Sequence, residues 1–459
     1  MRQFAGINDN RASSQRTTDE GLRINIVMKH ILILISLVTV VIAPSGLAQQ
    51  DPPPASTDLK SQIGTIIITP GNGPNLALAD FVARSAGIEA EVNTFNRVLT
   101  EDLNFASVAG IVGKSLNPKT LVPDPASLNF DEWSADPAKA DYVAFGNLQS
   151  GGSGLVSDTY LYDVKTKQQL IASRHAGDAR RMAHEFADEI VKLLTGRDGI
   201  ATSKIAYVSG DVIRMMDYDG FNQRGFANDG PLLRFPQFSP DGRYLAYVSF
   251  KSGVANIVVR SSSGALVGGT NYNSTTSSPT ISPNGQLAFS SAISRNGSME
   301  IYTSDLDGSN PRRLTRTNKI VNISPRWNPA TGREIAFISD RGGSPQIYVM
   351  DATGANQRPL ISRGGHSDSP SWSPDGRYIA FTYGGVGSYQ IFVADVATGQ
   401  LLQLTSQGRN QSPTWSPDGR HIAFHSSRSG TWEIWQMHID GTGQRQITRG
   451  GGRFPTWAK

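Results

Sequence analysis

The sequence predicts an all-β six-bladed propeller in the C-terminal part of the chain, preceded by a small α/β domain. The first observation is a repeat: the pattern Pro-x-aromatic-Ser-Pro-Asp-Gly, followed by a short apolar strand, recurs with variations through residues 234–459 of the 459-residue chain. Full copies begin at Pro236, Pro279, Pro325, Pro370 and Pro413, which are 43, 46, 45 and 43 residues apart. A period in the forties with several short strands per unit is typical of propeller blades.

The second observation is that the last copy is unfinished. It begins at Pro455, 42 residues after Pro413, and the chain ends two residues after Trp457. A lone strand needs partners, and the missing ones lie before the first full repeat, at residues 204–209 and 212–217. These segments resemble the second and third strands of a complete repeat. We therefore expect the C-terminal strand to complete the blade that begins near residue 204, closing a ring of six blades without a long open edge.

The third observation is a change of pattern upstream, where residues 63–202 mix helix and strand signals. Val92, Phe95, Leu99 and Leu103 recur at helical spacing, and residues 180–194 form a second amphipathic pattern with Met182, Phe186, Ile190 and Leu193 facing inward. Gly196 stands where a glycine often ends a helix. Strands are predicted at residues 65–69, 76–81 and 142–146, with a hairpin at 159–163 and 169–173. The predicted domains are thus 63–202 (α/β) and 203–459 (propeller).

The N-terminus carries the pattern of a cleavable secretory signal. Lys29 and His30 precede an apolar run at residues 31–43, and small residues end at Ala48. A membrane anchor is the alternative, but the run is shorter than the roughly 20 residues that a spanning helix needs. We expect translation to start at Met28, so that residues 1–48 comprise an extension and the signal, with cleavage after Ala48. The proline-rich residues 49–62 are expected to be a flexible mature N-terminus.

Composition excludes several classes of function. The chain has no cysteine, which excludes disulfides, thiolate metal sites and a cysteine nucleophile. Its formal net charge of +4 is small for its length, and no long basic run exists, so nucleic-acid binding is not indicated.

Motifs for catalysis or metal binding are incomplete. Residues 108–115 resemble a phosphate-binding loop but lack its first glycine, and Pro118 follows where a helix should start. His184 and Asp188 fall on one polar face of a helix, where a zinc helix would have two histidines. His421 and His425 lie on one strand, roughly 13 Å apart, too far for one metal ion. We predict no cofactor, no metal and no catalytic site.

Other repeated residues have structural explanations. The Asp-x-Asp-Gly segments at 217–220 and 305–308 lack the final glutamate of a calcium loop, so hairpin turns are expected there. The repeated tryptophans 327, 372, 415 and 457 are expected in the core between blades.

Residues just before each repeat should surround one mouth of the propeller channel, because they lead into the innermost strand of each blade. The candidate residues are Arg234, Asn273, Ser274, Asn322, Ile323, His366, Asp368, Arg409, Gln411 and Arg453. Several are arginines, which suits an acidic partner surface, and Asp368 is the only acidic residue among them.

The junction between the two predicted domains resembles that of the TolB family, periplasmic components of the Tol–Pal cell-envelope system. The resemblance is carried by residues 180–191, 194–200 and 204–208, with similar segments at 129–133 and 159–163, and it extends over residues 49–459.

The resemblance implies a non-catalytic periplasmic adaptor. It would bind the lipoprotein Pal through the propeller face and TolA through the mature N-terminus, maintaining the outer membrane and supporting envelope constriction at division. The family's TolA-binding segment is not clearly visible in residues 49–62, so either residues 65–69 take that part or TolA binding differs here. The alternative is the propeller of a secreted carbohydrate-binding or hydrolase-type protein.

Overall fold

The structure is a computed structural model that describes residues 73–152, 154–294, 298–361, 365–385 and 387–459. Apart from Gly385 and Gly387, all of these belong to one unit that comprises Pro52–Gly384 and Ser388–Lys459. The predicted signal sequence, the N-terminal segment 49–62 and the predicted strand at 65–69 lie outside the described residues. Within the described part of the chain, no helix is long and apolar enough to cross a membrane.

The first sheet of the chain is mixed and has the order β3-β1-β4-β5-β6, with β2 also paired to β4. Strands β1, β2 and β3 run parallel to their neighbours, whereas β4, β5 and β6 form an antiparallel meander. The strands are β1 (Asn75–Leu78), β2 (Val82–Ala83), β3 (Gly110–Ile111), β4 (Tyr142–Gly151), β5 (Gly154–Asp163) and β6 (Gln169–Gly177). The predicted hairpin is confirmed as β5 and β6. The predicted strand at 76–81 is shorter than expected, because β1 ends at Leu78 and β2 begins only at Val82.

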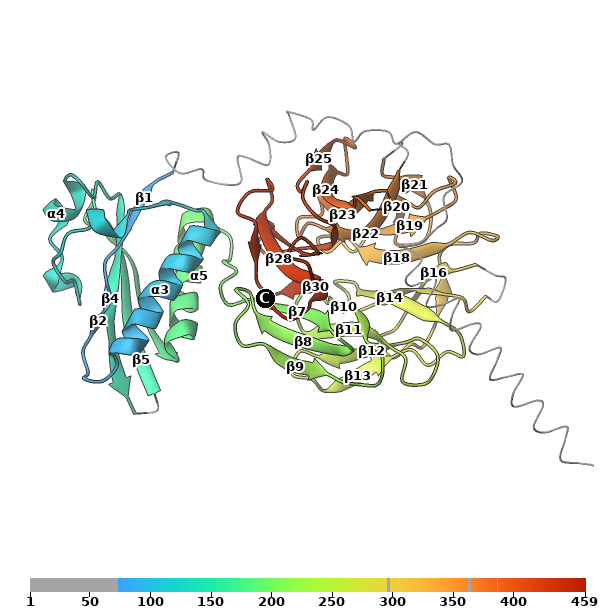
Figure 1. Cartoon of the computed structure of the whole chain (residues 1–459), viewed down its shortest axis with the longest axis horizontal. Helices are drawn as coiled ribbons and strands as arrows, with labels where there is room; N and C mark the ends of the chain where they lie inside the picture. The colour runs from blue at the N-terminus through green and yellow to red at the C-terminus, as the bar shows by residue number, and fades with distance from the viewer. Residues whose placement is uncertain (1–72, 153, 295–297, 362–364, 386) are drawn as a thin grey trace, which may run out of the picture. The chain divides into compact units, whose positions relative to one another are not determined.

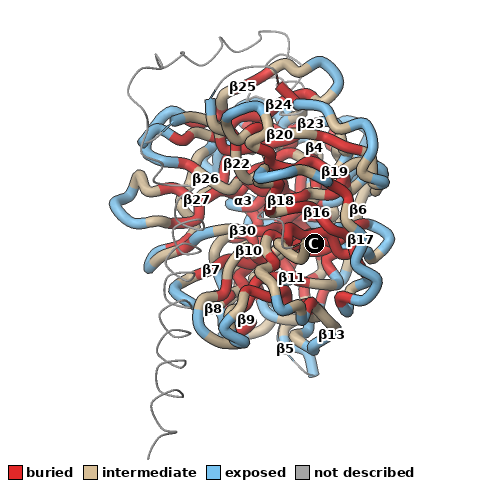
Figure 2. Tube along the Cα trace, turned by 90° about the vertical axis from the view of Figure 1, so that its right-hand side faces the viewer, coloured by how far each residue is buried: buried red, intermediate tan, exposed pale blue. Residues whose placement is uncertain are grey.

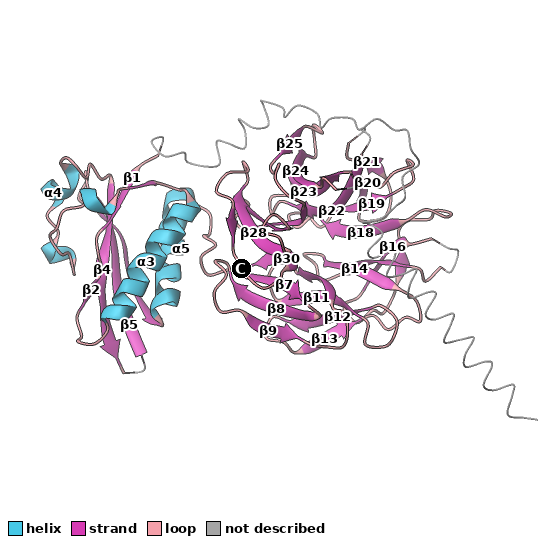
Figure 3. Ribbon diagram, in the orientation of Figure 1, coloured by secondary structure: helices cyan, strands magenta, loops and turns pink. Residues whose placement is uncertain are grey.

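Two long helices, α3 (Glu89–Ala106) and α5 (Ala179–Thr195), bury one face each and pack together (Figure 3). Three short helical segments, η1 (Lys114–Leu116), η2 (Pro125–Ser127) and α4 (Phe130–Ser134), lie between β3 and β4. In α5 the side chain of Asp178 caps the start, and Gly196 ends the helix in the left-handed conformation with φ 70°. The expectation that Leu193 faces inward is wrong, because Leu193 is 45% exposed. Leu194, four residues after Ile190, takes the inward position.

Six four-stranded antiparallel sheets follow, as the repeats predicted. Five are consecutive in sequence: β10 (Arg234–Phe238), β11 (Tyr244–Ser249), β12 (Asn256–Ser261), β13 (Leu266–Gly269); β14 (Thr276–Ile281), β15 (Leu287–Ser291), β16 (Glu300–Ser304), β17 (Arg312–Arg313); β18 (Asn322–Trp327), β19 (Glu334–Ser339), β20 (Gln346–Asp351), β21 (Arg358–Pro359); β22 (His366–Trp372), β23 (Tyr378–Gly384), β24 (Gln390–Asp395), β25 (Leu401–Gln403); β26 (Asn410–Trp415), β27 (His421–Ser426), β28 (Glu433–His438), β29 (Arg445–Gln446). Buried segments follow the strands, whereas exposed ones lie in the connecting loops (Figure 2).

The sixth sheet joins the two ends of the propeller. Its order is β30-β7-β8-β9, with β30 (Arg453–Ala458), β7 (Lys204–Ser209), β8 (Val212–Asp217) and β9 (Arg224–Ala227). Strand β30 pairs antiparallel with β7, and Trp457 lies opposite Ile205. Figure 1 shows the red C-terminal strand beside the green strand β7. The predicted closure by the C-terminal strand is confirmed.

Each innermost strand contains a bulge that the repeat pattern did not predict. The residue before the repeat proline has a left-handed backbone conformation, with φ between 49° and 54°. The pairing register between the first and second strands shifts at that point in all six blades. These residues are Phe235, Ser278, Ser324, Ser369, Ser412 and Phe454. A left-handed residue other than glycine costs on the order of 1 kcal/mol.

In three blades, hydrogen bonds to the preceding blade offset part of the cost of this strain. The backbone N–H of Ser324 donates to Ser290 Oγ and that of Ser412 to Thr382 Oγ1, both over 3.1 Å. The N–H of Phe454 donates to His425 Nδ1 over 3.3 Å. Each acceptor stands on the second strand of the preceding blade, so the bulges link neighbouring blades.

The repeated tryptophans lie in the core between blades, as predicted, and each is 5–6% exposed. Their indole N–H groups differ. Trp372 and Trp415 donate to backbone carbonyls of the preceding blade, and Trp457 donates to Ser203 Oγ over 2.7 Å. The indole N–H of Trp327 has no hydrogen-bond partner among the described residues.

This difference predicts unequal costs for the same substitution. Trp457→Phe removes a buried hydrogen bond and leaves Ser203 without its donor, whereas Trp327→Phe removes an unpartnered N–H. We expect Trp457→Phe to lower the free energy of unfolding by about 1–2 kcal/mol more than Trp327→Phe. Urea unfolding of both variants measures the difference, and equal costs would contradict a stabilising role for the closing hydrogen bond.

Candidate functional site

The predicted mouth residues cluster where the innermost strands begin. Arg234, Ile323, Asp368, Gln411 and Arg453 each stand immediately before the left-handed residue of their blade. In β14 the equivalent residue is Ser277, and the candidates Asn273 and Ser274 lie just before this strand.

Exposure separates the ten candidates. Asn273, Arg409 and Arg453 are exposed, and Arg234, Ser274, Ile323, His366, Asp368 and Gln411 are half-buried. Asn322 is fully buried, so its expected place on the accessible mouth is wrong. Its amide donates to Glu300 Oε2 over 3.1 Å, and its oxygen accepts from Arg341 over 2.9 Å. Asn322 therefore links its own blade, through Arg341, to Glu300 of the preceding blade.

Aromatic rings and arginines meet where the closing strand joins the first complete repeat. Phe235 and Phe454 lie edge to face with ring centroids 4.8 Å apart. The guanidinium of Arg453 lies 5.1 Å from the ring centroid of Trp432. Arg234 is held by the carbonyl of Leu233 over 2.6 Å, with its Nη1 3.7 Å from an Asp211 carboxylate oxygen. At this mouth, arginine side chains therefore lie beside aromatic rings. Arginine and aromatic residues are both enriched at protein interfaces.

The acidic candidate Asp368 stands beside His366 on β22. Burial raises the pKa of Asp368 and lowers the pKa of His366. The Asp368 carboxylate accepts the backbone N–H of Ser369 over 2.6 Å. The ten candidates contain no second carboxylate, so these residues alone do not form the carboxylate pair typical of a glycosidase.

His425 lies beside the aromatic residues of this mouth. It packs against Trp432 and Phe454 with centroid distances of 4.9 and 5.3 Å. Burial, and then the charge of Arg453, lower the pKa of His425 to about 3. Its ring is therefore neutral at physiological pH, with Nδ1 free to accept the Phe454 N–H.

A second polar cluster lies between helices α3 and α5, and the expectation of a solvated polar face on α5 is wrong there. His184 is 5% exposed, and its Nδ1 lies 2.6 Å from Asp102 Oδ2. Tyr218, just after β8, donates to Asp102 Oδ1 over 2.5 Å. Burial raises the pKa of Asp102. Burial alone would lower the pKa of His184, but the hydrogen bond with Asp102 and its charge raise it above the ordinary value.

Asp188, on the same helix, is also buried and caps the start of the link to the propeller. Its carboxylate accepts the backbone N–H groups of Ala201 and Thr202 over 2.7 and 3.2 Å. The polar residues of α5 therefore connect the helix to the segment before β7. The available signal was that Asp102 and His184 occupy apolar-periodic positions of their helices.

His184, Asp217 and Asp219 form the one group in the described residues whose ligand atoms are close enough for a metal ion, within 4.8 Å of one another. Both carboxylates already have cationic partners. Asp219 pairs with Arg180, and Asp217 pairs with Lys204. Because two cations neutralise two carboxylates here, the group fits an ion-pair cluster and not a divalent metal site.

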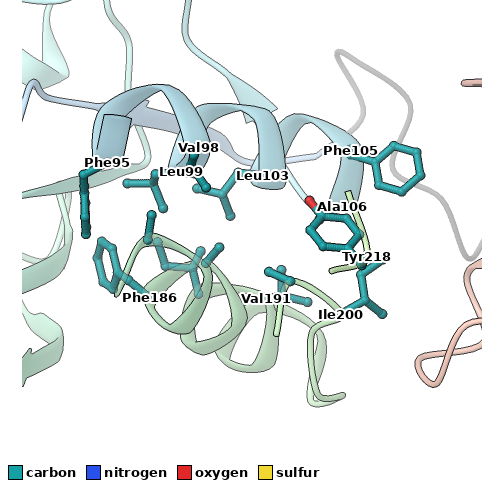
Figure 4. Close-up of a cluster of buried hydrophobic side chains, with 14 of the residues drawn as sticks. Phe95, Val98, Leu99, Leu103, Phe105, Ala106, Phe186, Val191, Ile200 and Tyr218 are labelled. Carbon is teal, nitrogen blue, oxygen red and sulfur yellow. The ribbon is translucent and has the colours of Figure 1, made fainter. Parts of the chain in front are cut away.

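The end of α3 packs directly on the propeller. The ring of Phe105 stacks on His421 with centroids 4.6 Å apart and lies under the guanidinium of Arg445 at 3.5 Å. Its carbonyl lies 3.0 Å from Nε2 of both His421 and His438, and Arg420 donates to the next carbonyl, Ala106. Figure 4 shows Phe105 and Ala106 beside Tyr218, continuous with the apolar contacts between the helices. Propeller side chains thus satisfy the free carbonyls of a helix C-terminus.

The fold defines this chain as a β-propeller protein with a preceding α/β segment and an arginine- and aromatic-rich channel mouth. Residues 191–459 match the family model described as TolB beta propeller domain. That match covers more than half of the chain, and the chain therefore belongs to the TolB family.

Individual relatives agree with this assignment. The chain is 30% identical to "Protein TolB homolog" of Chlorobium chlorochromatii over 296 residues, 62% of each chain. It is 32% identical to "Tol-Pal system protein TolB" of Bordetella pertussis over 275 residues, 58% of this chain and 60% of the relative. The aligned part thus spans about three fifths of these relatives. The crystal structure of TolB from Acinetobacter baumannii superposes with a TM-score of 0.70 at 25% identity, covering 85% of this chain and 97% of that one.

The buried Asp102–His184 pair predicts a large cost for a small change. Asp102→Asn removes the charge that His184 and Tyr218 contact, and breaking a buried ion pair costs about 3–5 kcal/mol. The neighbouring Glu101→Gln is the control, because its pair with Arg97 is about half exposed on both sides and should change the free energy of unfolding by less than about 1 kcal/mol. Urea unfolding compares the two, and similar small effects would exclude a structural role for the pair.

His425 predicts an acid-sensitive stability. Its pKa is about 3 in the folded protein, below its ordinary value near 6.5, so the unfolded state binds the proton between these values. The contribution of neutral His425 is complete above about pH 6.5 and is lost as the pH falls toward 3. His425→Thr removes this dependence and keeps an acceptor, as Thr382 does in the preceding blade.

We expect the wild type to lose about 3 kcal/mol more than His425→Thr between pH 7 and pH 4. Urea unfolding at both pH values measures this difference. His438, whose pKa burial lowers to about 4, remains in both proteins and supplies a common background. Parallel pH profiles would contradict the assignment of a neutral buried His425.

Proposed function

We propose that this protein is a non-catalytic periplasmic component of the Tol–Pal system that binds the lipoprotein Pal at the channel mouth formed by the starts of the innermost strands. The observation that carries the proposal is the arginine and aromatic cluster at this mouth, in a chain of the TolB family. The relative in Bordetella pertussis is named as a Tol-Pal system protein, which supports the same role here.

The chemistry of the mouth favours an acidic protein surface. Arg409 and Arg453 are exposed, and Arg234 is half-buried beside them in the ring order of the strands. Fixed cations of this kind accelerate encounter with an acidic partner, and the Phe235–Phe454 pair supplies apolar area for a stable contact. The closed ring fixes the backbone that carries these side chains, which lowers the cost of ordering on binding.

TolA binding, periplasmic localisation and a role in outer-membrane integrity and cell division complete the proposal. They rest on family membership and on the predicted secretory signal with cleavage after Ala48. The mature N-terminus, residues 49–62, is the proposed TolA-binding segment.

The proposal predicts that charge reversal at the mouth weakens Pal binding. We expect Arg409→Glu with Arg453→Glu to weaken binding of the periplasmic part of the same organism's Pal at least 10-fold, because two attractive contacts become repulsive. Calorimetry with the mature protein, Gln49 onward, measures the affinity.

Arg243→Glu with Arg333→Glu is the matched control. Both arginines are exposed and stand in the turns that follow the innermost strands, at the opposite end of the channel. The control should bind Pal like the wild type. If both double variants bind equally, the mouth is not the Pal site. If the folded wild type does not bind Pal at all, the function is better explained as that of a carbohydrate-binding or hydrolase-type propeller.

A further inference from the structure

The channel end opposite the predicted Pal mouth contains a cavity of about 220 Å³. It is lined by the ends of the innermost strands and by the prolines of the turns that follow them. The residue between the repeat proline and the aromatic residue faces this cavity in five blades: Gln237, Thr280, Arg326, Ser371 and Thr414. Four of these side chains are neutral, so Arg326 introduces a single cation into a wall of hydroxyl and amide groups.

The guanidinium of Arg326 is only partly satisfied by the protein. Its Nη1 donates to the carbonyls of Pro325 and Pro279 over 2.9 and 3.3 Å, which fixes the side chain across two blades. Its Nε and Nη2 donate to no acceptor within the described residues, and no carboxylate of that part of the chain lies within ion-pair distance. Two directed N–H-bearing nitrogens thus remain available to a ligand.

Within the described residues, no carboxylate forms an ion pair with Arg326. Burial lowers its pKa to about 10, only partly opposed by the more distant Asp368, so the group is still cationic at neutral pH. The Asp368 carboxylate is engaged by the Ser369 N–H and lies next to His366. Arg326 is half-buried, and a partly desolvated charge without a close partner is unfavourable. Blade architecture does not require a charge here, since a threonine occupies the same position in three other blades, as Thr280, Thr414 and Thr456.

We propose that this cavity is a binding site for a small oxyanion, held by the guanidinium of Arg326 and by the hydroxyl groups of Thr280, Ser371 and Thr414. Arginine suits such a ligand because its planar N–H groups match the oxygens of phosphate or carboxylate. Hydroxyl groups donate the remaining hydrogen bonds without adding charge. The mouth residue Asp368 is near enough to influence Arg326, but the proposal does not depend on the proposed function.

The test measures the melting temperature of the full mature protein during titration with inorganic phosphate at constant ionic strength, with sodium chloride as the balancing salt. We expect a saturable rise of a few degrees, because a ligand that binds only the folded state stabilises it. A parallel titration with malonate distinguishes the source: a larger rise with phosphate assigns a phosphate-type ligand, and a larger rise with malonate assigns a carboxylate. If neither anion raises the melting temperature, the proposal is wrong.

Arg326→Thr places at this position the residue that the preceding blade has as Thr280. We expect it to abolish the anion-dependent rise and to melt higher than the wild type in phosphate-free buffer, because the uncompensated charge is gone. Arg333→Thr is the control, since it removes the same charge from an exposed turn and should keep the full response. An unchanged response in Arg326→Thr would place any anion site elsewhere and overturn the proposal.

Ser371→Glu keeps the experiment decisive if Arg326→Thr does not fold. This substitution brings a carboxylate into the same cavity, so it should raise the melting temperature without added anion and remove the response to phosphate. A Ser371→Glu variant that still responds to phosphate like the wild type would show that the anion does not occupy this cavity.

Discussion

The pairing of the C-terminal strand β30 with β7 is the interaction on which the rest of the structure depends. It converts a row of six sheets into a closed ring, and only a closed ring has a channel with two defined mouths. The pairing also brings Phe454 against Phe235, and so creates the aromatic base of the predicted Pal mouth from residues more than 200 positions apart. The hydrogen bond from Trp457 in β30 to Ser203, just before β7, further connects the two ends of the propeller.

The α/β domain is joined to this ring by more than its link. Carbonyl groups at the C-terminal end of α3 accept hydrogen bonds from histidine and arginine side chains of the propeller. The ring of Phe105 stacks on His421 in the same contact. Tyr218, at the end of a propeller strand, completes the buried pair of Asp102 and His184. A propeller segment therefore satisfies polar groups that would be orphaned in an isolated α/β domain. Consequently, buried apolar residues of helices α3 and α5 and of the closing blade belong to one cluster.

The candidate site could be predicted from the sequence only in part. The repeat correctly indicated which strand lines the channel, and Arg234, Asp368, Gln411 and Arg453 occupy the expected level. Asn273 and Ser274 lie before their strand. Asn322 is buried because Glu300 of the preceding blade and Arg341 of its own blade bind its amide, and the local pattern does not show these contacts. The singular position of Arg326 was also hidden, since a repeat alignment gives the position of a side chain but not its unpaired donors.

The sequence by itself determined the number of blades, the closure by the last strand, the inter-blade place of the tryptophans and the two amphipathic helices. All of these follow from local periodicity or from the repeat, which act through neighbouring residues along one strand or helix. Only the tertiary structure decided that His184 and Asp188 are buried, that His425 is neutral and accepts the Phe454 N–H, and that Arg326 faces a cavity without a counterion. Each of these depends on which distant groups surround a polar side chain, and desolvation and hydrogen bonding are set by that surrounding and not by the local pattern.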